Sequence, residues 1–165
     1  MKAPEINVVT DDGRTLPLAE FYQTQELALV FLRHLGCIFC RQQVAQLRVH
    51  SSLNIAFVCM ADAEKAAEFK QKMRSPHTFI ADPNREVYQA FGLGKGESKQ
   101  VFNPKVFAKG MGAILAGHFV GQPVGDVWQM PGIFVINPQG EIIWEYKSVD
   151  IADNPNADQL IRQLT

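Results

Sequence analysis

The sequence predicts an α/β fold in which helices cover a central β-sheet. Along the first half of the chain, short apolar runs alternate with helical patterns, an order typical of parallel strands joined by right-handed crossovers. Nearer the C-terminus, two β-rich runs flank residues 137–140, Asn-Pro-Gln-Gly, and predict an antiparallel hairpin. No repeat, low-complexity segment or linker interrupts the chain, so we expect a single domain over residues 1–165.

The first strand and the first helix of this series flank a pair of cysteines. The run ELALVFLRH, which begins at Glu26, is continuous and apolar, as expected for a strand that is covered on both faces. After the cysteines, RQQVAQLRVHSSL places apolar residues at near-helical spacing. We therefore expect the chain to pass from a buried strand through a cysteine loop into a helix.

Further strands and helices follow in alternation. NIAFVCMAD has the pattern of a central strand, and the helix-forming AEKAAEFKQKMR comes next, with Asp62 placed to cap its start. HTFIADPN predicts a short strand, and REVYQAFGLG predicts a short helix that ends at a glycine.

The glycine-rich residues 94–127 break this rhythm. Within them we expect a loop, a helix from about Pro104 to Leu115, and a second loop. After the hairpin, NADQLIRQL predicts a short amphipathic helix near the end of the chain.

Composition and charge exclude a nucleic-acid-binding platform. Of the 165 residues, 47% are hydrophobic and 20% are charged, and the formal net charge is -1. These values are typical of a soluble globular protein that buries one core. Because Lys and Arg are scattered and form no basic stripe, we expect no nucleic-acid partner.

The apolar stretches also indicate a compartment. The opening MKAPEINVVTDDGR has no apolar core, so we expect no secretory signal and a mature chain that begins here. GMGAILAGHFVG is too short and too interrupted to cross a bilayer, which takes roughly 20 residues. We therefore expect a cytoplasmic protein without a membrane partner, whose cysteines are kept reduced on average.

The pair Cys37 and Cys40 is the strongest chemical signal in the chain. A thiolate forms near neutral pH when a helix N-terminus or a cation stabilises its charge, and Arg33, His34 and Arg41 are the cations nearest in sequence. Two intervening residues allow the sulfurs to meet across one helical turn. A C-x-x-C beside a β-α-β pattern predicts a redox-active pair with Cys37 and Cys40 as catalytic residues.

Two other interpretations of the pair stay open. A zinc site needs two more ligands, and the other Cys and His residues show no second paired spacing, so we expect no metal and no other cofactor. The cysteines could also be two small buried residues at a strand end. Cys59, within the next apolar run, is expected to pack in the core.

Met130 and Pro131, just before the apolar run GIFVI, form the second informative element. Proline cannot donate to a sheet ladder, so Pro131 belongs at the first position of a strand. A cis peptide bond there would place backbone polar groups of Met130 beside a reacting sulfur. The alternative is an ordinary proline at a strand start.

These motifs together resemble the thioredoxin superfamily, and more narrowly the AhpC/TSA branch of peroxiredoxin-like proteins. The similarity runs along nearly the whole chain, through the strand into GCIFC, the segment ADPNREVYQAFGL, the hairpin MPGIFVINPQGEI and the closing helix. FLRHLGCIFCR is most similar to the peroxiredoxin-like 2 proteins, which carry C-x-x-C where typical peroxiredoxins have Thr-x-x-Cys. The resemblance implies a thioredoxin-like fold with a central mixed β-sheet flanked by helices.

The peroxide pocket of typical peroxiredoxins matches this chain only in part. Their pattern is Pro-x-x-x-Thr-x-x-Cys with a later arginine; on this chain Cys40 takes the peroxidatic position and Cys37 replaces the threonine. Arg33 stands where the proline would be, and Pro131 falls near the expected arginine, at the position of the thioredoxin-type cis-proline. Arg33 or Arg41 could replace that arginine.

The resemblance implies two mechanisms that share one dithiol. In the first, Cys40 attacks a hydroperoxide and Cys37 condenses with the sulfenic acid to a disulfide, which a thioredoxin-type reductant reopens. In the second, Cys37 attacks a partner disulfide and Cys40 resolves the mixed disulfide. A redox-sensing or binding module without turnover is the third option. Peroxiredoxin-like proteins often dimerise, so a homodimer stays open beside a monomer.

Overall fold

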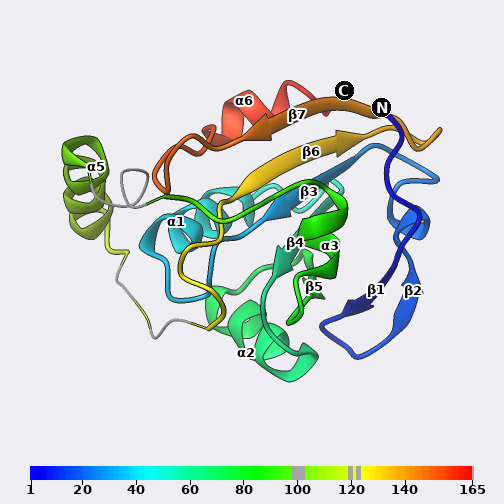
Figure 1. Ribbon diagram of the computed structural model, residues 1–165, viewed down its shortest axis with the longest axis horizontal. Helices are drawn as coiled ribbons and strands as arrows, with labels where there is room; N and C mark the ends of the chain where they lie inside the picture. The colour runs from blue at the N-terminus through cyan, green and yellow to red at the C-terminus, as the bar shows by residue number, and fades with distance from the viewer. Residues whose placement is uncertain (98–102, 119–120, 122–123, 165) are drawn as a thin grey trace.

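A mixed seven-stranded sheet forms the centre of the molecule (Figure 1). The computed structural model describes residues 1–97, 103–118, 121 and 124–164. The strands lie in the order β2-β1-β5-β4-β3-β6-β7. Their bounds are β1 Asn7–Thr10, β2 Thr15–Pro17, β3 Leu27–Phe31, β4 Ile55–Cys59, β5 Thr78–Ala81, β6 Gly132–Ile136 and β7 Ile142–Lys147. Strands β3, β4 and β5 are parallel to their neighbours in this group, and the other pairs are antiparallel.

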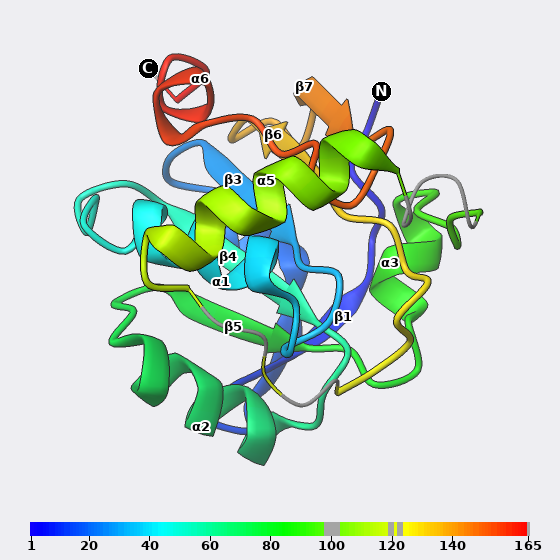
Figure 2. The same cartoon turned by 90° about the vertical axis from the view of Figure 1, so that its left-hand side faces the viewer.

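Helices cover both faces of the sheet (Figure 2). Helices α1, α2 and α6 pack against one face, and α3 and the 3-10 helix η1 pack against the other. Helix α5 stands at the edge of the molecule and lies against α1 rather than against the sheet. The bounds are η1 Leu18–Phe21, α1 Ile38–Leu47, α2 Ala63–Met73, α3 Glu86–Ala90, α5 Pro104–Leu115 and α6 Ala157–Ile161.

Strand β3 is the strand on which the site is built. All five of its residues are buried, and alternate side chains enter the two separate apolar clusters on the two faces of the sheet. Its neighbours are β4 on one side and β6 on the other. The continuous apolar run therefore predicted a doubly covered central strand correctly, because neither face needs polar residues.

Most predicted elements are confirmed, including the helix Pro104–Leu115. Asp62 caps α2 by accepting a hydrogen bond from the Lys65 backbone N–H. The loops predicted around α5 lie partly outside the described residues. Helix α1 ends at Leu47, earlier than the apolar spacing of the sequence suggested.

The N-terminal hairpin β1–β2 was not predicted. Its strands have only four and three residues, too few for an alternating pattern to stand out. The turn between them contains Gly13 at a positive φ of 81°, and this Asp-Asp-Gly turn was the available signal. The hairpin extends the sheet beyond β5, far from the cysteines.

A buried tyrosine ties the ends of β3 and β4 together. The Tyr88 hydroxyl on α3 lies 2.6 Å from the carbonyl oxygen of Leu32 and 2.9 Å from that of Val58. Tyr88 is fully buried, so the hydroxyl has no exchange with bulk water. This contact fixes the end of β3, where the cysteine loop begins.

None of the helices within the described ranges is both long and apolar enough to cross a membrane.

Replacing Tyr88 with phenylalanine should lower the free energy of unfolding by about 1–3 kcal/mol, because the Leu32 carbonyl loses the Tyr88 donor and the Val58 carbonyl keeps only the Leu32 N–H. Chemical denaturation of Tyr88→Phe measures this. Tyr22→Phe is the matched control, since within the described part of the chain the Tyr22 hydroxyl makes no hydrogen bond. Equal stability of both variants and the wild type would contradict the prediction.

Candidate active site

The two cysteines lie where β3 leads into α1. Cys37 is the N-cap residue of α1 with extended backbone angles, and Cys40 is the third residue of the helix. The Cys37 backbone N–H donates to the His34 carbonyl, which turns the chain tightly between strand and helix. The structure therefore brings the predicted pair together at the strand-to-helix junction.

Both sulfurs are free thiols with little contact with solvent. Cys37 is 4% exposed and Cys40 1%. The Arg33 backbone N–H donates to Cys40 Sγ at 3.1 Å, and Arg33 Nη1 lies 3.8 Å from Cys37 Sγ. A single residue therefore contacts both sulfurs, one through its backbone and one through its side chain.

Arg33 is a buried cation, only 6% exposed. Its Nη1 contacts His34 Nε2 at 3.1 Å, and its Nη2 donates to the Val127 carbonyl oxygen. No carboxylate of the described residues lies within ion-pair distance of its guanidinium. Because a buried charge is costly unless it is compensated, the Cys37 thiolate is the natural counterion.

The surroundings separate the pKa values of the two sulfurs. The Cys40 thiol lowers the pKa of Cys37 to about 6, helped by the Cys40 backbone N–H and the Arg33 guanidinium and opposed by burial. Burial, together with the neighbouring Cys37, raises the pKa of Cys40 above its ordinary value. The surroundings therefore favour the charged form at Cys37 and the neutral form at Cys40.

His34 is neutral at physiological pH. Burial, and then the charge of Arg33, lowers the pKa of His34 to about 4. Because Arg33 can only donate, His34 Nε2 accepts and Nδ1 carries the proton. His34 Nδ1 is buried and has no hydrogen-bond partner among the described residues. The ring therefore orients Arg33 and is a poor candidate for a general base.

Arg41 is directed away from the sulfurs. Its Nε donates to the Leu35 carbonyl at 3.2 Å, and its guanidinium lies over the Phe69 ring at 5.7 Å from the ring centre. A Cβ atom at Gly121 would lie 2.1 Å from Arg41 Nη2, so a side chain at this position would require the guanidinium to shift. Of the two arginines proposed from the sequence, only Arg33 faces the cysteines.

Met130 and Pro131 lie beside the site without offering it backbone groups. Pairing of Gly132 with Phe31 brings them next to the end of β3, and the Met130 side chain belongs to the apolar cluster that includes both cysteines. The described residues contain no cis peptide bond, so the Met130–Pro131 bond is trans. The Met130 N–H donates to the Gly94 carbonyl and its carbonyl accepts from Gln129 Nε2.

The Val127 carbonyl could not be predicted from local pattern, although Val127 lies three residues before Met130. It contacts Arg33 across 94 positions of sequence. Cys59 is fully buried at the end of β4, and burial raises its pKa to about 12, as expected for a core thiol. Within the described ranges, no three Cys, His, Asp or Glu side chains gather in a way that could hold a metal ion.

Sequence comparisons relate the chain to thiol-dependent antioxidant enzymes. The profile of the AhpC/TSA antioxidant enzyme family matches residues 41–150 and so begins one position after Cys40. A chloroplastic thioredoxin-like protein from Arabidopsis thaliana is 24% identical over 172 residues, which cover 95% of this chain and 69% of that protein. Peroxiredoxin-like 2C from Bos taurus is 23% identical over 100 residues, 56% of this chain and 44% of its own length.

Solved structures share the fold at low sequence identity. Peroxidoxin BcpB from Mycobacterium tuberculosis superposes with a TM-score of 0.67 and 12% identity, covering 99% of this chain and 90% of that one. A peroxiredoxin-like protein from Aquifex aeolicus gives 0.69 and 14%, covering 98% and 82%. These likenesses confirm the predicted thioredoxin-like fold.

The thiolate absorbance of the reduced protein should titrate with a midpoint near pH 6, because Cys37 gains stabilisation only when charged. In Arg33→Met the midpoint should rise by roughly one unit or more, since an opposite charge is lost. Arg41→Met is the control and should keep the wild-type midpoint. A wild-type midpoint close to the ordinary thiol value of 9.0 would refute this assignment.

The free energy of unfolding should fall as the pH drops from 6.5 toward 4, in part because of His34. Between these values the unfolded chain binds a proton at His34 that the native state does not, which costs up to about 1.4 kcal/mol per pH unit. The slope should be smaller in His34→Gln and unchanged in the control His50→Gln, measured by denaturant unfolding at each pH. Identical slopes in both variants would exclude this contribution.

Proposed function

Because the chain belongs to the AhpC/TSA antioxidant enzyme family of the thioredoxin superfamily, we propose that it reduces hydroperoxides through reversible formation of a Cys37–Cys40 disulfide. Membership of this family makes it an oxidoreductase with a peroxiredoxin-type redox function. The observation that carries the proposal is the position of Cys37 Sγ between the Arg33 guanidinium and the Cys40 thiol.

In the first step, the Cys37 thiolate attacks the terminal oxygen of the hydroperoxide. The O–O bond breaks, Cys37 becomes a sulfenic acid, and the alkoxide that leaves takes up a proton to become an alcohol or water. The low pKa of Cys37 supports this residue as the attacking sulfur. This reverses the roles implied by alignment with Thr-x-x-Cys, in which Cys40 holds the peroxidatic position.

In the second step, the Cys40 thiol attacks the Cys37 sulfenic acid. A disulfide forms, and water leaves with the sulfenic oxygen. Cys40 suits the resolving role because its raised pKa keeps it protonated, and therefore unreactive toward peroxide, until Cys37 is oxidised. A thioredoxin-type dithiol then reduces the disulfide and becomes a disulfide itself.

Arg33 supplies the cation of the site. Its Nη1 is already directed at Cys37 Sγ, where the developing negative charge on the peroxide oxygens would be close to it. The bonds to His34 and to the Val127 carbonyl hold the guanidinium in this place before substrate arrives. Arg41 donates from Nε to the Leu35 carbonyl and lies over the Phe69 ring, so we assign it no part in the step.

Disulfide exchange with a protein partner is the alternative use of the same dithiol. It would also begin with attack by Cys37, followed by resolution by Cys40. The 4% exposure of Cys37 favours a small hydroperoxide over the disulfide of a folded partner, because the partner has to bring its sulfur into line with Cys37. We therefore rank peroxide reduction first.

Stopped-flow thiol loss with hydrogen peroxide, with products identified by intact mass, tests this order of events. Cys37→Ser should abolish fast thiol loss, whereas Cys40→Ser should react at the wild-type rate and accumulate a sulfenic acid at Cys37. Arg33→Met should slow the reaction at least about tenfold, a loss typical of removing one charge-stabilising donor. Cys59→Ser and Arg41→Met are the matched controls and should behave as wild type.

Two results would overturn the proposal. Fast thiol loss in Cys37→Ser would make Cys40 the attacking sulfur. Slow loss in all proteins, combined with trapping of a mixed disulfide at Cys37 in Cys40→Ser, would make the chain a disulfide exchanger.

A further inference from the structure

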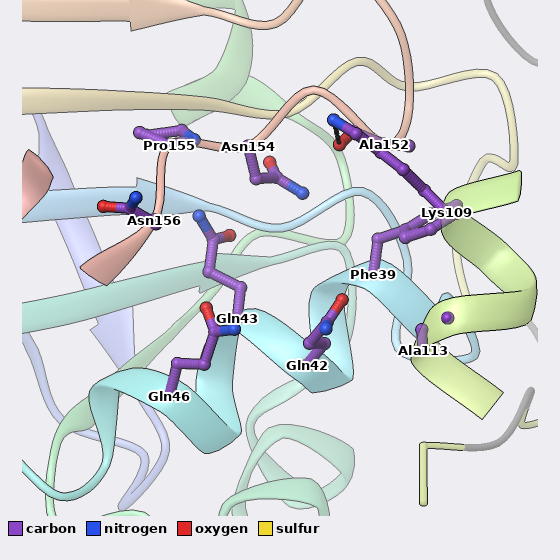
Figure 3. A pocket seen from close by; sticks show the side chains of 11 residues that line it. Phe39, Gln42, Gln43, Gln46, Lys109, Ala113, Ala152, Asn154, Pro155 and Asn156 are labelled. Carbon is purple, nitrogen blue, oxygen red and sulfur yellow. Dashed lines mark hydrogen bonds between the residues drawn. The ribbon is translucent and has the colours of Figure 1, made fainter. Parts of the chain in front are cut away.

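A polar groove lies between α1, α5 and the segment before α6 (Figure 3). Its volume is about 340 Å³, within the range of small-molecule sites. One face of α1 forms its floor, through residues spaced three and four apart: Phe39, Gln42, Gln43 and Gln46. Neither cysteine lines the groove, but Phe39 lies between them in sequence.

The floor of the groove carries amide side chains. Three of its four residues are glutamines; Gln46 is exposed and Gln42 half-buried, as is usual for polar positions on a helix, whereas Gln43 is buried. Gln43 is only 4% exposed, and its Nε2 has no hydrogen-bond partner among the described residues. Figure 3 shows the Gln43 amide directed from α1 toward Asn154 and Asn156, across the groove.

The electrostatics of the groove favour an anion. Among the lining residues that the structure describes, Lys109 is the one charged residue and none is Asp or Glu. The Lys109 ammonium donates to the Ala152 carbonyl at 3.0 Å, which places it at the groove and leaves two further protons for a ligand. Two carboxylates close in sequence to Ala152 are engaged with other groups: Asp150 with Lys105, and Asp153 with Tyr146.

We propose that this groove binds a small peptide-like carboxylate. The carboxylate lies at Lys109, and the buried Gln43 amide turns toward the ligand so that Nε2 donates a hydrogen bond to one of its carbonyl oxygens. The remaining amides can both donate to and accept from peptide groups, and Phe39 offers an apolar surface to the ligand's side chain. This ligand satisfies the buried amide, which is the feature that the fold alone does not explain.

Titration calorimetry with S-methylglutathione tests the proposal on the full-length reduced protein. This probe has two carboxylates and two amide groups but no thiol, so its binding is independent of any redox activity of the cysteines. Gln43→Met and Lys109→Gln should each weaken binding at least tenfold. Gln71→Met and Lys72→Gln, on the exposed side of α2, repeat the same chemical changes away from the groove and should bind like the wild type.

The stability of Gln43→Met and the affinity of an esterified probe test two separate parts of the proposal. Gln43→Met should unfold at the wild-type temperature or above it, because the substitution removes a buried amide that has no partner in the free protein. The dimethyl ester of the probe should bind at least tenfold more weakly than the probe itself. The proposal is overturned by no binding at millimolar probe, by equal affinity in Lys109→Gln, or by a lower melting temperature of Gln43→Met, which would give Gln43 a role in the fold.

Discussion

The site depends on a guanidinium that is buried without a carboxylate partner in the described structure. Arg33 follows the central strand β3, where burial on both faces leaves no water to solvate its charge. Three neutral or acidic groups surround it instead: the His34 ring, the Val127 carbonyl and the Cys37 sulfur. Of these, only the Cys37 sulfur can become an anion, so the protein stabilises its cation best when Cys37 is ionised.

This arrangement also makes the two cysteines unequal. They are separated by only two residues, yet Cys37 faces the side chain of Arg33 while Cys40 receives its backbone N–H. Helix α1 contributes to the same asymmetry. Cys37 is its N-cap residue, where the helix dipole stabilises a negative charge, whereas Cys40 lies within the first turn and is buried in the core. In the proposed mechanism, this difference makes Cys37 the attacking sulfur and Cys40 the resolving sulfur.

Local pattern was enough to predict the elements that carry this chemistry. The apolar run of β3, the helix after Cys37 and the capping Asp62 all depend on residues close together in sequence, where spacing directly encodes burial. The choice between Arg33 and Arg41 could not be made in this way. Each lies four residues from Cys37 in sequence, and tertiary contacts separate them: Arg33 Nη1 approaches Cys37 Sγ, whereas Arg41 packs on Phe69.

Contacts between residues far apart in sequence could not be predicted from local pattern. The Val127 carbonyl reaches Arg33 because the antiparallel pairing of β6 with β3 returns the chain to the end of the central strand. The same pairing brings Pro131 close to the end of β3. The bond before Pro131 is trans and the Met130 N–H is bonded to the Gly94 carbonyl, so the hydrogen bonds to the sulfurs come from segment 33–40. A thioredoxin-type cis proline beside the cysteines was one of two interpretations of the sequence, the other being an ordinary proline at a strand start. Here residues 33–40 contain the cation and both sulfurs, and the segment that carries the Val127 carbonyl mainly fixes the cation in place.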